Sequence, residues 1–323
     1  MGGHQNPSRD PSAAAAIDLG SESVLLLIAR RGEKGQLTVL EDHALSGRLA
    51  SCIEPDGSLD EGPLERTLEV LETLARRIEL AGVEPSRRRL VATAAARRLR
   101  DPSALVERVR ARTGLTLEVI SAELEGRLAF AGAIGTAAEK RGAGEPLLID
   151  VGGGSTEVVW SGGSSVRSLP FGAAVGARDH FGLDGTQPRG DAGLDAWRQR
   201  VRSALETLDE LRGLGADREA VVIGGTASNL ACLEAGGETF DLRTAEGATI
   251  SAAAAERWAE TIADLDFESR LDLPIEPQRA DLLAPGLVCL AESLRRVGSD
   301  QARVTGRGLR HALVKGLLEP ASA

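Results

Sequence analysis

The chain has 323 residues, 42% of them hydrophobic and 27% charged, which is the composition of an ordinary globular protein with one large or two medium domains. It excludes a disordered or collagen-like chain. The 38 basic and 48 acidic residues give a net charge of -10, and with 5 Phe, 3 Trp and no Tyr the chain offers few groups that bind or stack on nucleic acid. We therefore expect no nucleic-acid partner.

Neither a membrane anchor nor a disulfide framework is expected. The longest aliphatic run, residues 24–29, is too short to cross a bilayer, and Asp18 interrupts the run before it that could form a signal-peptide core. The three cysteines, Cys52, Cys232 and Cys289, lie far apart and form no CxxC motif, which argues against a zinc site. These observations predict a cytoplasmic protein without membrane contact.

The first part of the chain alternates between strands and helices, after residues 1–12, whose Gly, Pro, Ser and Asn content predicts a flexible tail. Residues 136–145, rich in Ala and Gly, predict a surface connection. The spacing of apolar residues predicts strands at 15–19, 24–30, 89–92 and 117–120, and helices at 64–78, from Pro102 to about Gly114, and at 123–133.

The second part of the chain repeats the beginning of the first. An apolar strand at 147–151 leads into the turn GGGST and a returning strand at 157–160, just as IDLGS at 17–21 leads into its own returning strand. The two aspartates, Asp18 and Asp150, are 150 − 18 = 132 positions apart. This repeat predicts two copies of one α/β domain. A third glycine turn follows a strand at 221–223 and opens a helix, and amphipathic helices complete this part.

A glycine turn between two strands can bind phosphate, because its backbone amides point outward with no side chain in the way. A single such turn is more often structural, but a pair of them favours a phosphate site. Two turns that face each other across a cleft would hold a phosphate chain between them. The aspartates at the strand ends could bind a divalent cation that neutralises phosphate oxygens.

At this point the sequence resembles the exopolyphosphatase and guanosine pentaphosphate phosphohydrolase family of the actin, hexokinase and Hsp70 superfamily. The resemblance runs from about residue 15 to 317 and implies two duplicated ribonuclease H-like (actin-like ATPase) domains with an interdomain cleft. Domain I would cover 13–130 plus 308–323, and domain II would cover 131–307. The segments that carry it are AAIDLGSESVLLLIA, VATAAARRLRD, VISAELEGRLAFAGA, LLIDVGGGSTEVVW, SLPFGAAVGARDHF, VVIGGTASNLACL, QRADLLAPGL and VTGRGLRHAL.

The resemblance implies a role for each matched residue. Glu125 would be the catalytic base that accepts a proton from water, although from the sequence alone it could equally be a helix-surface residue. Asp150 and Glu157 would act with it in catalysis and, with Asp18, would hold Mg²⁺ or another divalent cation. The substrate-binding residues would be Gly20, Ser21, Ser23, Arg97, Gly152, Gly153, Gly154, Ser155, Thr156, Gly224, Gly225 and Thr226.

A group of arginines close to Arg97 allows two interpretations. Residues 86–101 contain Arg87, Arg88, Arg89, Arg97, Arg98 and Arg100 against the single acidic Asp101. Such a concentration of positive charge could steer a polyanion in a chain of net charge -10. A solvated basic face explains the triplet at 87–89 equally well.

The chain also departs from the family pattern. Glu22 stands in place of an Asn within the first phosphate motif, where an anion is unfavourable unless it binds a metal or points outward. Leu25 stands in place of an Arg, and the loss of this Arg weakens the case for guanosine pentaphosphate. Leu124 and Ala122 replace a Glu and a Gly beside Glu125, which makes the general base less secure. His311 replaces a Glu near the C-terminus, with no consequence that we can derive.

Together with the resemblance, these features predict an exopolyphosphatase that hydrolyses terminal phosphoanhydride bonds of inorganic polyphosphate and releases orthophosphate. Family members with extra C-terminal domains are much longer, so a short polyphosphate is a plausible substrate, while the preferred chain length stays open. The alternatives are a guanosine pentaphosphate phosphohydrolase, a polyphosphate–nucleotide phosphotransferase that uses Gly224, Gly225, Thr226 and Asn229, and a non-catalytic sensor of polyphosphate or an alarmone. The resemblance makes a homodimer possible, since dimers are common among relatives, but the sequence leaves the oligomeric state open.

Overall fold

The computed structural model describes residues 10–33, 35–134, 145–181 and 190–319. It divides into two compact units, Met1–Ser121 with Leu309–Ala323, and Ala122–Gly308. Most of the connection predicted at 136–145 lies outside the described residues. None of the helices in the described ranges is long and apolar enough to cross a membrane.

Part of the predicted flexible tail belongs to the fold, so that prediction is wrong for residues 10–12. The amide of Asp10 donates to the carbonyl of Ala81 at 2.9 Å, and its carboxylate lies 3.5 Å from the guanidinium of Arg30. Arg87 donates to the carbonyl of Ser12 at 2.9 Å. Residues 1–9 lie outside the described part of the chain.

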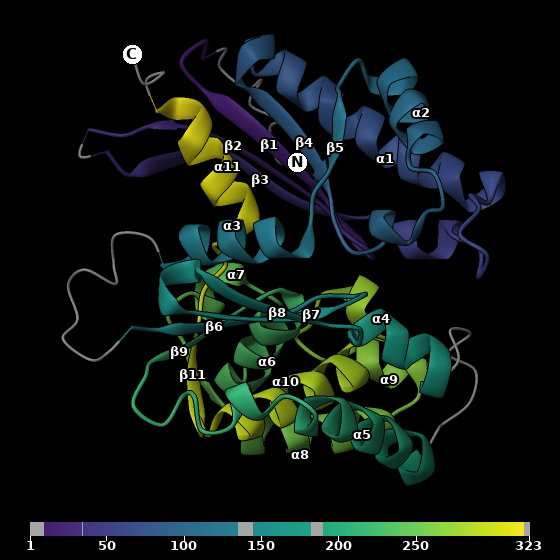
Figure 1. The fold of residues 1–323 in the computed structure, drawn as a ribbon, viewed down its shortest axis with the longest axis vertical. Coiled ribbons are helices and arrows are strands. Elements are labelled where there is room, and N and C mark those ends of the chain that lie inside the picture. The colour runs from purple at the N-terminus through teal and green to yellow at the C-terminus, as the bar shows by residue number, and fades with distance from the viewer. Residues whose placement is uncertain (1–9, 34, 135–144, 182–189, 320–323) are drawn as a thin grey trace. The chain divides into compact units, whose positions relative to one another are not determined.

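The first unit is a five-stranded sheet with helices on both faces (Figure 1). The strand order is β3-β2-β1-β4-β5, in which β1, β2 and β3 are antiparallel and β4 and β5 run parallel to β1. Alternate residues of β1 share one core with α1 and α2, and α11 packs on β1 and β2. The strands are β1 (Ala14–Leu19), β2 (Ser23–Arg31), β3 (Leu37–Ser46), β4 (Arg88–Ala92) and β5 (Leu117–Val119). The helices are η1 (Leu49–Cys52), α1 (Glu61–Leu80), η2 (Pro85–Arg87), η3 (Ala96–Arg98), α2 (Ser103–Thr113) and α11 (Leu309–Leu318).

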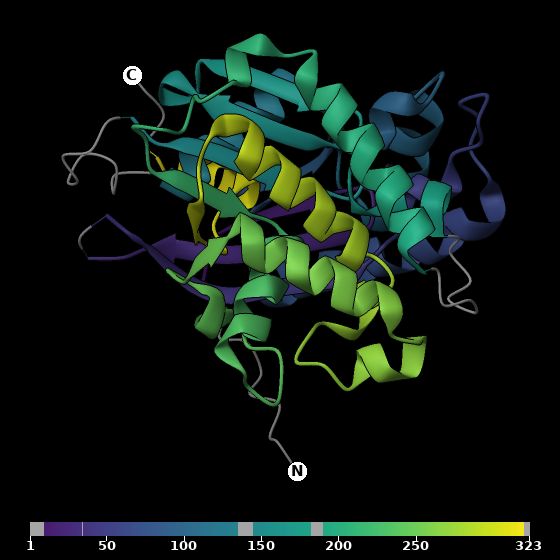
Figure 2. The same ribbon diagram turned by 90° about the horizontal axis from the view of Figure 1, so that it is seen from below.

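The second unit is a six-stranded sheet of order β10-β11-β9-β6-β7-β8. Helix α3 covers one face of it, and α5, α6, α8 and α10 cover the other, with α10 flanked by α5 and α8 (Figure 2). The strands are β6 (Leu147–Val151), β7 (Thr156–Trp160), β8 (Ser165–Leu169), β9 (Ala220–Ile223), β10 (Thr249–Ser251) and β11 (Gln301–Val304). The longer helices are α3 (Ala122–Ile134), α5 (Gly190–Glu206), α6 (Gly225–Ala235), α8 (Ala252–Asp264) and α10 (Leu283–Val297). The shorter ones are η5 (Ser161–Gly163), α4 (Ala173–Gly176), η6 (Ala177–Phe181), η7 (Asp209–Leu211), α7 (Leu242–Ala245), α9 (Phe267–Leu271) and η8 (Pro277–Arg279).

The predicted duplication and fold class are confirmed. The order β3-β2-β1-β4-β5 of the first unit recurs in the second as β8-β7-β6-β9-β11, with β10 added at the edge. Both glycine hairpins close in the same way, because Gly20 donates to the carbonyl of Ser23 and Gly152 to that of Ser155, each at 3.0 Å. The chain is therefore an α/β protein built from two copies of one unit.

The border between the units differs from the expectation of 130 and 131, since the structure groups the chain from Ala122 onward with the second unit. The reason is packing: Phe130 and Ile134 of α3 share a core with Leu148 and Val159 of the second sheet. Within the same helix, a Cβ at Gly126 would lie 2.6 Å from Val166, so this glycine lets α3 approach β8 closely.

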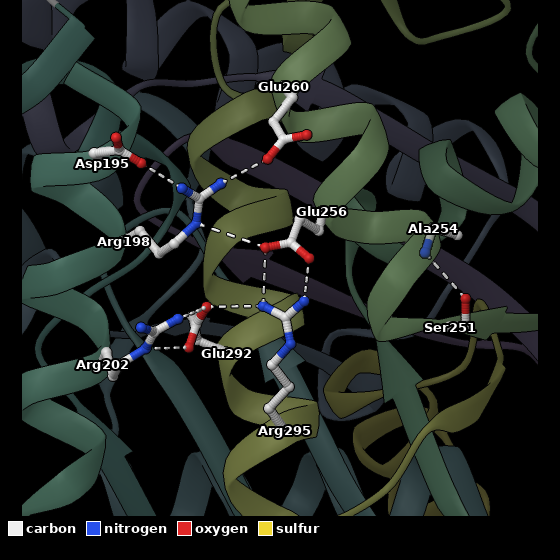
Figure 3. A network of polar contacts seen from close by, with 9 residues as sticks. All are labelled: Asp195, Arg198, Arg202, Ser251, Ala254, Glu256, Glu260, Glu292 and Arg295. Atoms are coloured by element: carbon white, nitrogen blue, oxygen red, sulfur yellow. Dashed lines mark hydrogen bonds and ion pairs between the residues drawn. The ribbon is translucent and has the colours of Figure 1, made fainter. Parts of the chain in front are cut away.

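Helices α5, α8 and α10 are joined by a network of ion pairs (Figure 3). Glu292 of α10 is 4% exposed and accepts two hydrogen bonds from Arg202 of α5, both at 3.0 Å, and one from Arg295 at 3.0 Å. Arg295 also pairs with Glu256 of α8, which lies 3.9 Å from Arg198. Because two guanidinium groups meet the buried carboxylate, its charge is compensated within the helix layer under the sheet.

The three cysteines are all buried and unpaired by disulfides, as the sequence predicts. Burial raises the pKa of each thiol above its ordinary value, and that of Cys289 most strongly. They serve as core residues in both units.

Candidate active site

Two carboxylates face each other on the β6–β7 hairpin of the second unit. Asp150 and Glu157 are partners in the antiparallel register, so their side chains lie on the same face of the sheet at the end of β6. Glu157 is 2% exposed, and Ser168 on β8 donates to its Oε1 at 2.7 Å. The hydroxyl of Ser155 is a second hydrogen-bond partner of this carboxylate.

Glu125 joins these two carboxylates from helix α3. Burial, then repulsion by Glu125, raises the pKa of Asp150 from 3.8 to about 7, while the positive charge of Arg279 opposes this shift. Burial, then Glu125 and Asp150, also raises the pKa of Glu157, against the two serine hydrogen bonds. The three acidic groups therefore repel one another when they are ionised, so ionising all of them at once costs free energy. Carboxylates with raised pKa values of this kind are typical of functional sites.

The third glycine turn lies beside Asp150. Strands β6 and β9 are parallel neighbours, with Asp150 opposite Ile223, so the residues after Ile223 emerge at the same sheet edge. Gly224 has a φ of +93°, and a Cβ there would lie 3.1 Å from Oδ1 of Asp150. A Cβ on Gly225 would lie 1.9 Å from Cζ of Arg279. Only glycines allow both approaches, which explains why two stand in sequence here.

The backbone of the glycine turn at 152–154 is held by the segment that follows β8. The amides of Ala173 and Ala174 donate to the carbonyls of Gly152 and Gly153, each at 2.9 Å. A Cβ on Gly172 would lie 2.6 Å from the carbonyl oxygen of Gly152, so this contact also requires glycine. Over the described residues, no acceptor in the chain meets the amides of Gly153 and Gly154. Amides of this kind suit an anion.

The first unit repeats the hairpin without the second carboxylate. Asp18 pairs across the strands with Leu25, at the position that Glu157 occupies in the second unit. Ser21 is 5% exposed, and its carbonyl accepts from the amide of Ala50 at 2.9 Å. Gly20, Ser21 and Ser23 thus form the predicted hairpin in the first unit, whereas the three carboxylates belong to the second.

Glu22, which stands where the family pattern has an Asn, lies close to the cationic side chain of Arg48. Its carboxylate lies 3.9 Å from Nε of Arg48, and its carbonyl accepts from the amides of Gly47 and Arg48, each at 2.9 Å. The negative charge that the sequence puts into the first phosphate turn is therefore partly offset within the same unit.

Three of the arginines near β4 are bound by acceptors of the first unit itself, so they do not form a free basic face. Arg88 donates to the carbonyl of Val83 at 2.5 and 2.8 Å, Arg89 pairs with Glu118 at 2.8 Å, and Arg100 pairs with Asp56 at 2.9 Å. Arg97 is half-buried and donates to the carbonyl of Ile120 at 3.1 Å. Its predicted role on phosphate stays a prediction.

Two residues predicted to bind substrate have side chains in the core instead. Thr156 is fully buried, and its hydroxyl donates to the carbonyl of Phe171 at 2.9 Å. Strand alternation puts Thr156 on the face opposite Glu157, which is the physical reason for this burial. Thr226 is 1% exposed and packs on Gly286 of α10, where a Cβ would lie 2.5 Å from its Oγ1. A role of these two residues on substrate through their backbone stays a prediction.

Sequence reasoning missed Arg279 and Ser168. Both stand in segments with a family-like pattern, QRADLLAPGL and SLPFG, but nothing in the order of residues shows that they approach Asp150 and Glu157. Ser168 reaches Glu157 through the pairing of β7 with β8. Arg279 reaches the site through the contacts of η8 and the residue before it with α6. Both contacts are tertiary.

The donor set suits Mg²⁺, which binds one or two carboxylates and completes its shell with water and phosphate oxygens. Among the described residues no group of three or more His, Cys, Asp or Glu side chains could hold a metal ion. The raised pKa values of Asp150 and Glu157 indicate a site where a cation would relieve repulsion. Asp150 and Glu157 therefore fit a Mg²⁺ ion. Asp18, the third predicted ligand, belongs to the other unit.

Comparison with known proteins agrees with this geometry. The sequence pattern of the Ppx/GppA phosphatase family matches residues 27–320. A crystal structure of the Aquifex aeolicus member of the Ppx/GppA family is 29% identical, with a TM-score of 0.75 over 96% of this chain and 99% of that chain. An exopolyphosphatase from Cytophaga hutchinsonii is 19% identical, with a TM-score of 0.80 over 95% of this chain and 97% of that chain, and is similar in fold.

Proposed function

Because the chain belongs to the Ppx/GppA phosphatase family, we propose that it is an exopolyphosphatase that hydrolyses the terminal phosphoanhydride bond of inorganic polyphosphate and releases orthophosphate. The observation that carries this proposal is the trio of mutually repelling carboxylates, Glu125, Asp150 and Glu157, beside two glycine turns. Acidic groups and anion-binding amides at one sheet edge suit a reaction of water with phosphate.

Glu125 is the group that accepts the proton of the attacking water. The oxygen of water forms a bond to the terminal phosphorus, the bridging P–O bond breaks, and the shortened chain leaves as an anion. Glu125 fits this task because it is half-buried, acts electrostatically on both neighbouring carboxylates and stands on a helix fixed by the close packing at Gly126. Little covalent chemistry is required from the protein beyond placing the water in line.

Asp150 and Glu157 would hold the divalent cation, with Ser155 and Ser168 orienting Glu157. When bound, the ion would neutralise phosphate oxygens. The amides of Gly153 and Gly154 and the guanidinium of Arg279 would bind the terminal phosphates. In the first unit, the hairpin with Gly20 and the side chain of Arg97 remain proposed contacts for the phosphate chain.

The test replaces Glu125 by Gln and measures orthophosphate release from tripolyphosphate with Mg²⁺. We expect kcat to fall by about 10²–10⁴-fold, since the amide cannot accept the proton. Glu123→Gln is the matched control, because Glu123 lies on the same helix, is exposed and pairs with Arg127. Release by Glu125→Gln at the wild-type rate would refute the assignment.

Phosphate release from other substrates and a binding measurement separate the alternative functions. Transfer to a nucleotide is disfavoured because the side chain of Asn229 already donates to the carbonyl of Gly225 and to Glu276 and accepts from the amide of Glu276. Phosphate release from guanosine pentaphosphate alone would identify the alarmone phosphohydrolase. Tight binding of polyphosphate without turnover would identify a sensor.

A further inference from the structure

The segment before α10 brings Arg279 to the third glycine turn. Its guanidinium lies against the backbone of Gly225, in the space that a Cβ would occupy, with Cζ only 1.9 Å from that position. The side chain is 16% exposed, and its charge lowers the pKa of Asp150. Arg279 therefore holds a positive charge at the start of α6, close enough to act on Asp150.

Two residues fix the orientation of this arginine. Oε2 of Glu276 accepts from Nε of Arg279 at 2.9 Å and from Nδ2 of Asn229 at 3.0 Å. The backbone amide of Glu276 donates to Oδ1 of Asn229 at 2.7 Å, and Nδ2 of Asn229 also donates to the carbonyl of Gly225 at 2.8 Å. Asn229 is fully buried. The Asn229–Glu276 pair thus joins Arg279 to the same turn on which its guanidinium lies.

The surrounding segment contributes little regular structure of its own. Helix α9 ends at Leu271, and η8 is a single turn. Arg270 is 4% exposed, donates to the carbonyls of Ile262 and Leu265, and lies 3.2 Å from Asp281. Ile275 and Ala280 anchor the segment in the core on either side of Glu276, and the Asn229–Glu276 pair adds a polar contact to α6 between them.

We propose that Glu276 and Asn229 are positioning residues that hold Arg279 in the orientation in which it binds a phosphate group at the Gly224–Gly225 turn. This inference rests on the proposed function, because the ligand is the phosphate chain of the substrate. In this proposal Glu276 holds Nε, and the guanidinium group of Arg279 contacts the phosphate.

The expected loss of binding follows from the number of Arg279 side-chain orientations that the Asn229–Glu276 pair excludes. An unrestrained side-chain torsion has three staggered wells, so releasing two torsions of Arg279 leaves about one ninth of the molecules in the binding orientation. The apparent dissociation constant rises by the inverse of that fraction, which is about tenfold. The chemical step is affected less, since Arg279 acts on substrate binding in this scheme.

The experiment is a double-mutant cycle with Glu276→Ala, Arg279→Ala and the double variant. Binding of tripolyphosphate is measured by calorimetry in the Glu125→Gln background, and KM and kcat are measured in the otherwise wild-type protein. Glu276→Gln tests rescue, because its amide oxygen can still accept from Asn229 and Arg279. Glu234→Ala is the control, since Glu234 lies on the same helix as Asn229 and pairs with an arginine, Arg257, away from the turn.

We expect Glu276→Ala to weaken binding about tenfold when Arg279 is present and less than twofold when it is absent. Glu276→Gln should recover most of the loss, and Glu234→Ala should bind like the parent. Equal losses in both arginine backgrounds, or no loss in either, would overturn the positioning role. Binding with this coupling but no orthophosphate release by the wild type would reject only the proposed hydrolysis, and absence of binding would reject both.

Discussion

The two glycine hairpins differ in the residue that stands opposite the aspartate. Leu25 and Glu157 occupy equivalent positions opposite Asp18 and Asp150, so the two hairpins share one backbone but only the second carries a carboxylate pair. Ser168 directs that pair, because its hydroxyl donates to Glu157. The three carboxylates are thus concentrated in one copy of the repeat, which the similar backbones alone do not reveal.

The raised pKa of Asp150 leads to a prediction about stability and pH. The carboxyl group of Asp150 has a pKa of about 7 in the folded state and an ordinary value of 3.8 in the unfolded state. Its contribution to the free energy of unfolding is therefore fully present below pH 3.8 and is lost as the pH rises through 7. Asp150→Asn removes this dependence. We expect Asp150→Asn to gain thermal stability over the wild type at pH 8 and not at pH 4, as measured by thermal melts in EDTA.

Addition of Mg²⁺ provides the control for this prediction. A cation held by Asp150 and Glu157 should raise the melting temperature of the wild type at pH 8 and that of Asp150→Asn much less. An Asp150→Asn protein that melts below the wild type at both pH values would contradict the proposed origin of the pKa shift.

At the scale of elements, the site depends on how closely α3 approaches β8. A Cβ at Gly126 would lie 2.6 Å from Val166 and 3.1 Å from Val159, so Gly126→Ala must push the helix outward. We expect a loss of about 1–3 kcal/mol in the free energy of unfolding, with a fall in kcat because Glu125 moves with the helix.

Denaturant unfolding and phosphate release measure these two effects. Gly316→Ala is the control: Gly316 lies inside helix α11, and a methyl group added there would meet no atom within 4 Å, so alanine should stabilise by roughly 0.5–1 kcal/mol. Full activity and stability in Gly126→Ala would show that Glu125 does not depend on this contact.

The sequence predicts the elements well where the signal is local. The glycine hairpins, the helix stop at Gly114 with a φ of +71°, and the strands around Asp18 and Asp150 follow from short patterns. Strand β3 could not be predicted, because it lies at the edge of the sheet and carries Glu41, Asp42 and other polar residues. Its sequence therefore lacks a clear alternation of apolar and polar residues. Arg279 could not be predicted, because its contact with the glycine turn arises only when η8 packs against α6, far away along the chain.

At the scale of the whole molecule, the second unit is one uninterrupted stretch, Ala122–Gly308, with its own sheet and cores on both faces. It also contains all three carboxylates. We expect the fragment 122–308 to fold alone and to unfold cooperatively, as monitored by circular dichroism and thermal melting. Under the proposed function it should release no orthophosphate, since the first glycine hairpin is missing.

The first unit offers the contrast, because its C-terminal helix α11 returns after the whole second unit and packs on β1 and β2. A fragment 1–121 without this helix exposes an apolar sheet face and should aggregate or remain unfolded. A fragment 122–308 that fails to fold would show that its cores need the rest of the chain.

The burial of all three thiols makes the native chain a convenient background for spectroscopic labelling. An exposed thiolate attacks a maleimide or a thiol-specific nitroxide reagent, but these three sulfur atoms are shielded and held protonated. One cysteine introduced on the surface of each unit would then take the probe selectively. Pairs of such probes would report the distance between the two units with and without polyphosphate, without first removing the natural cysteines.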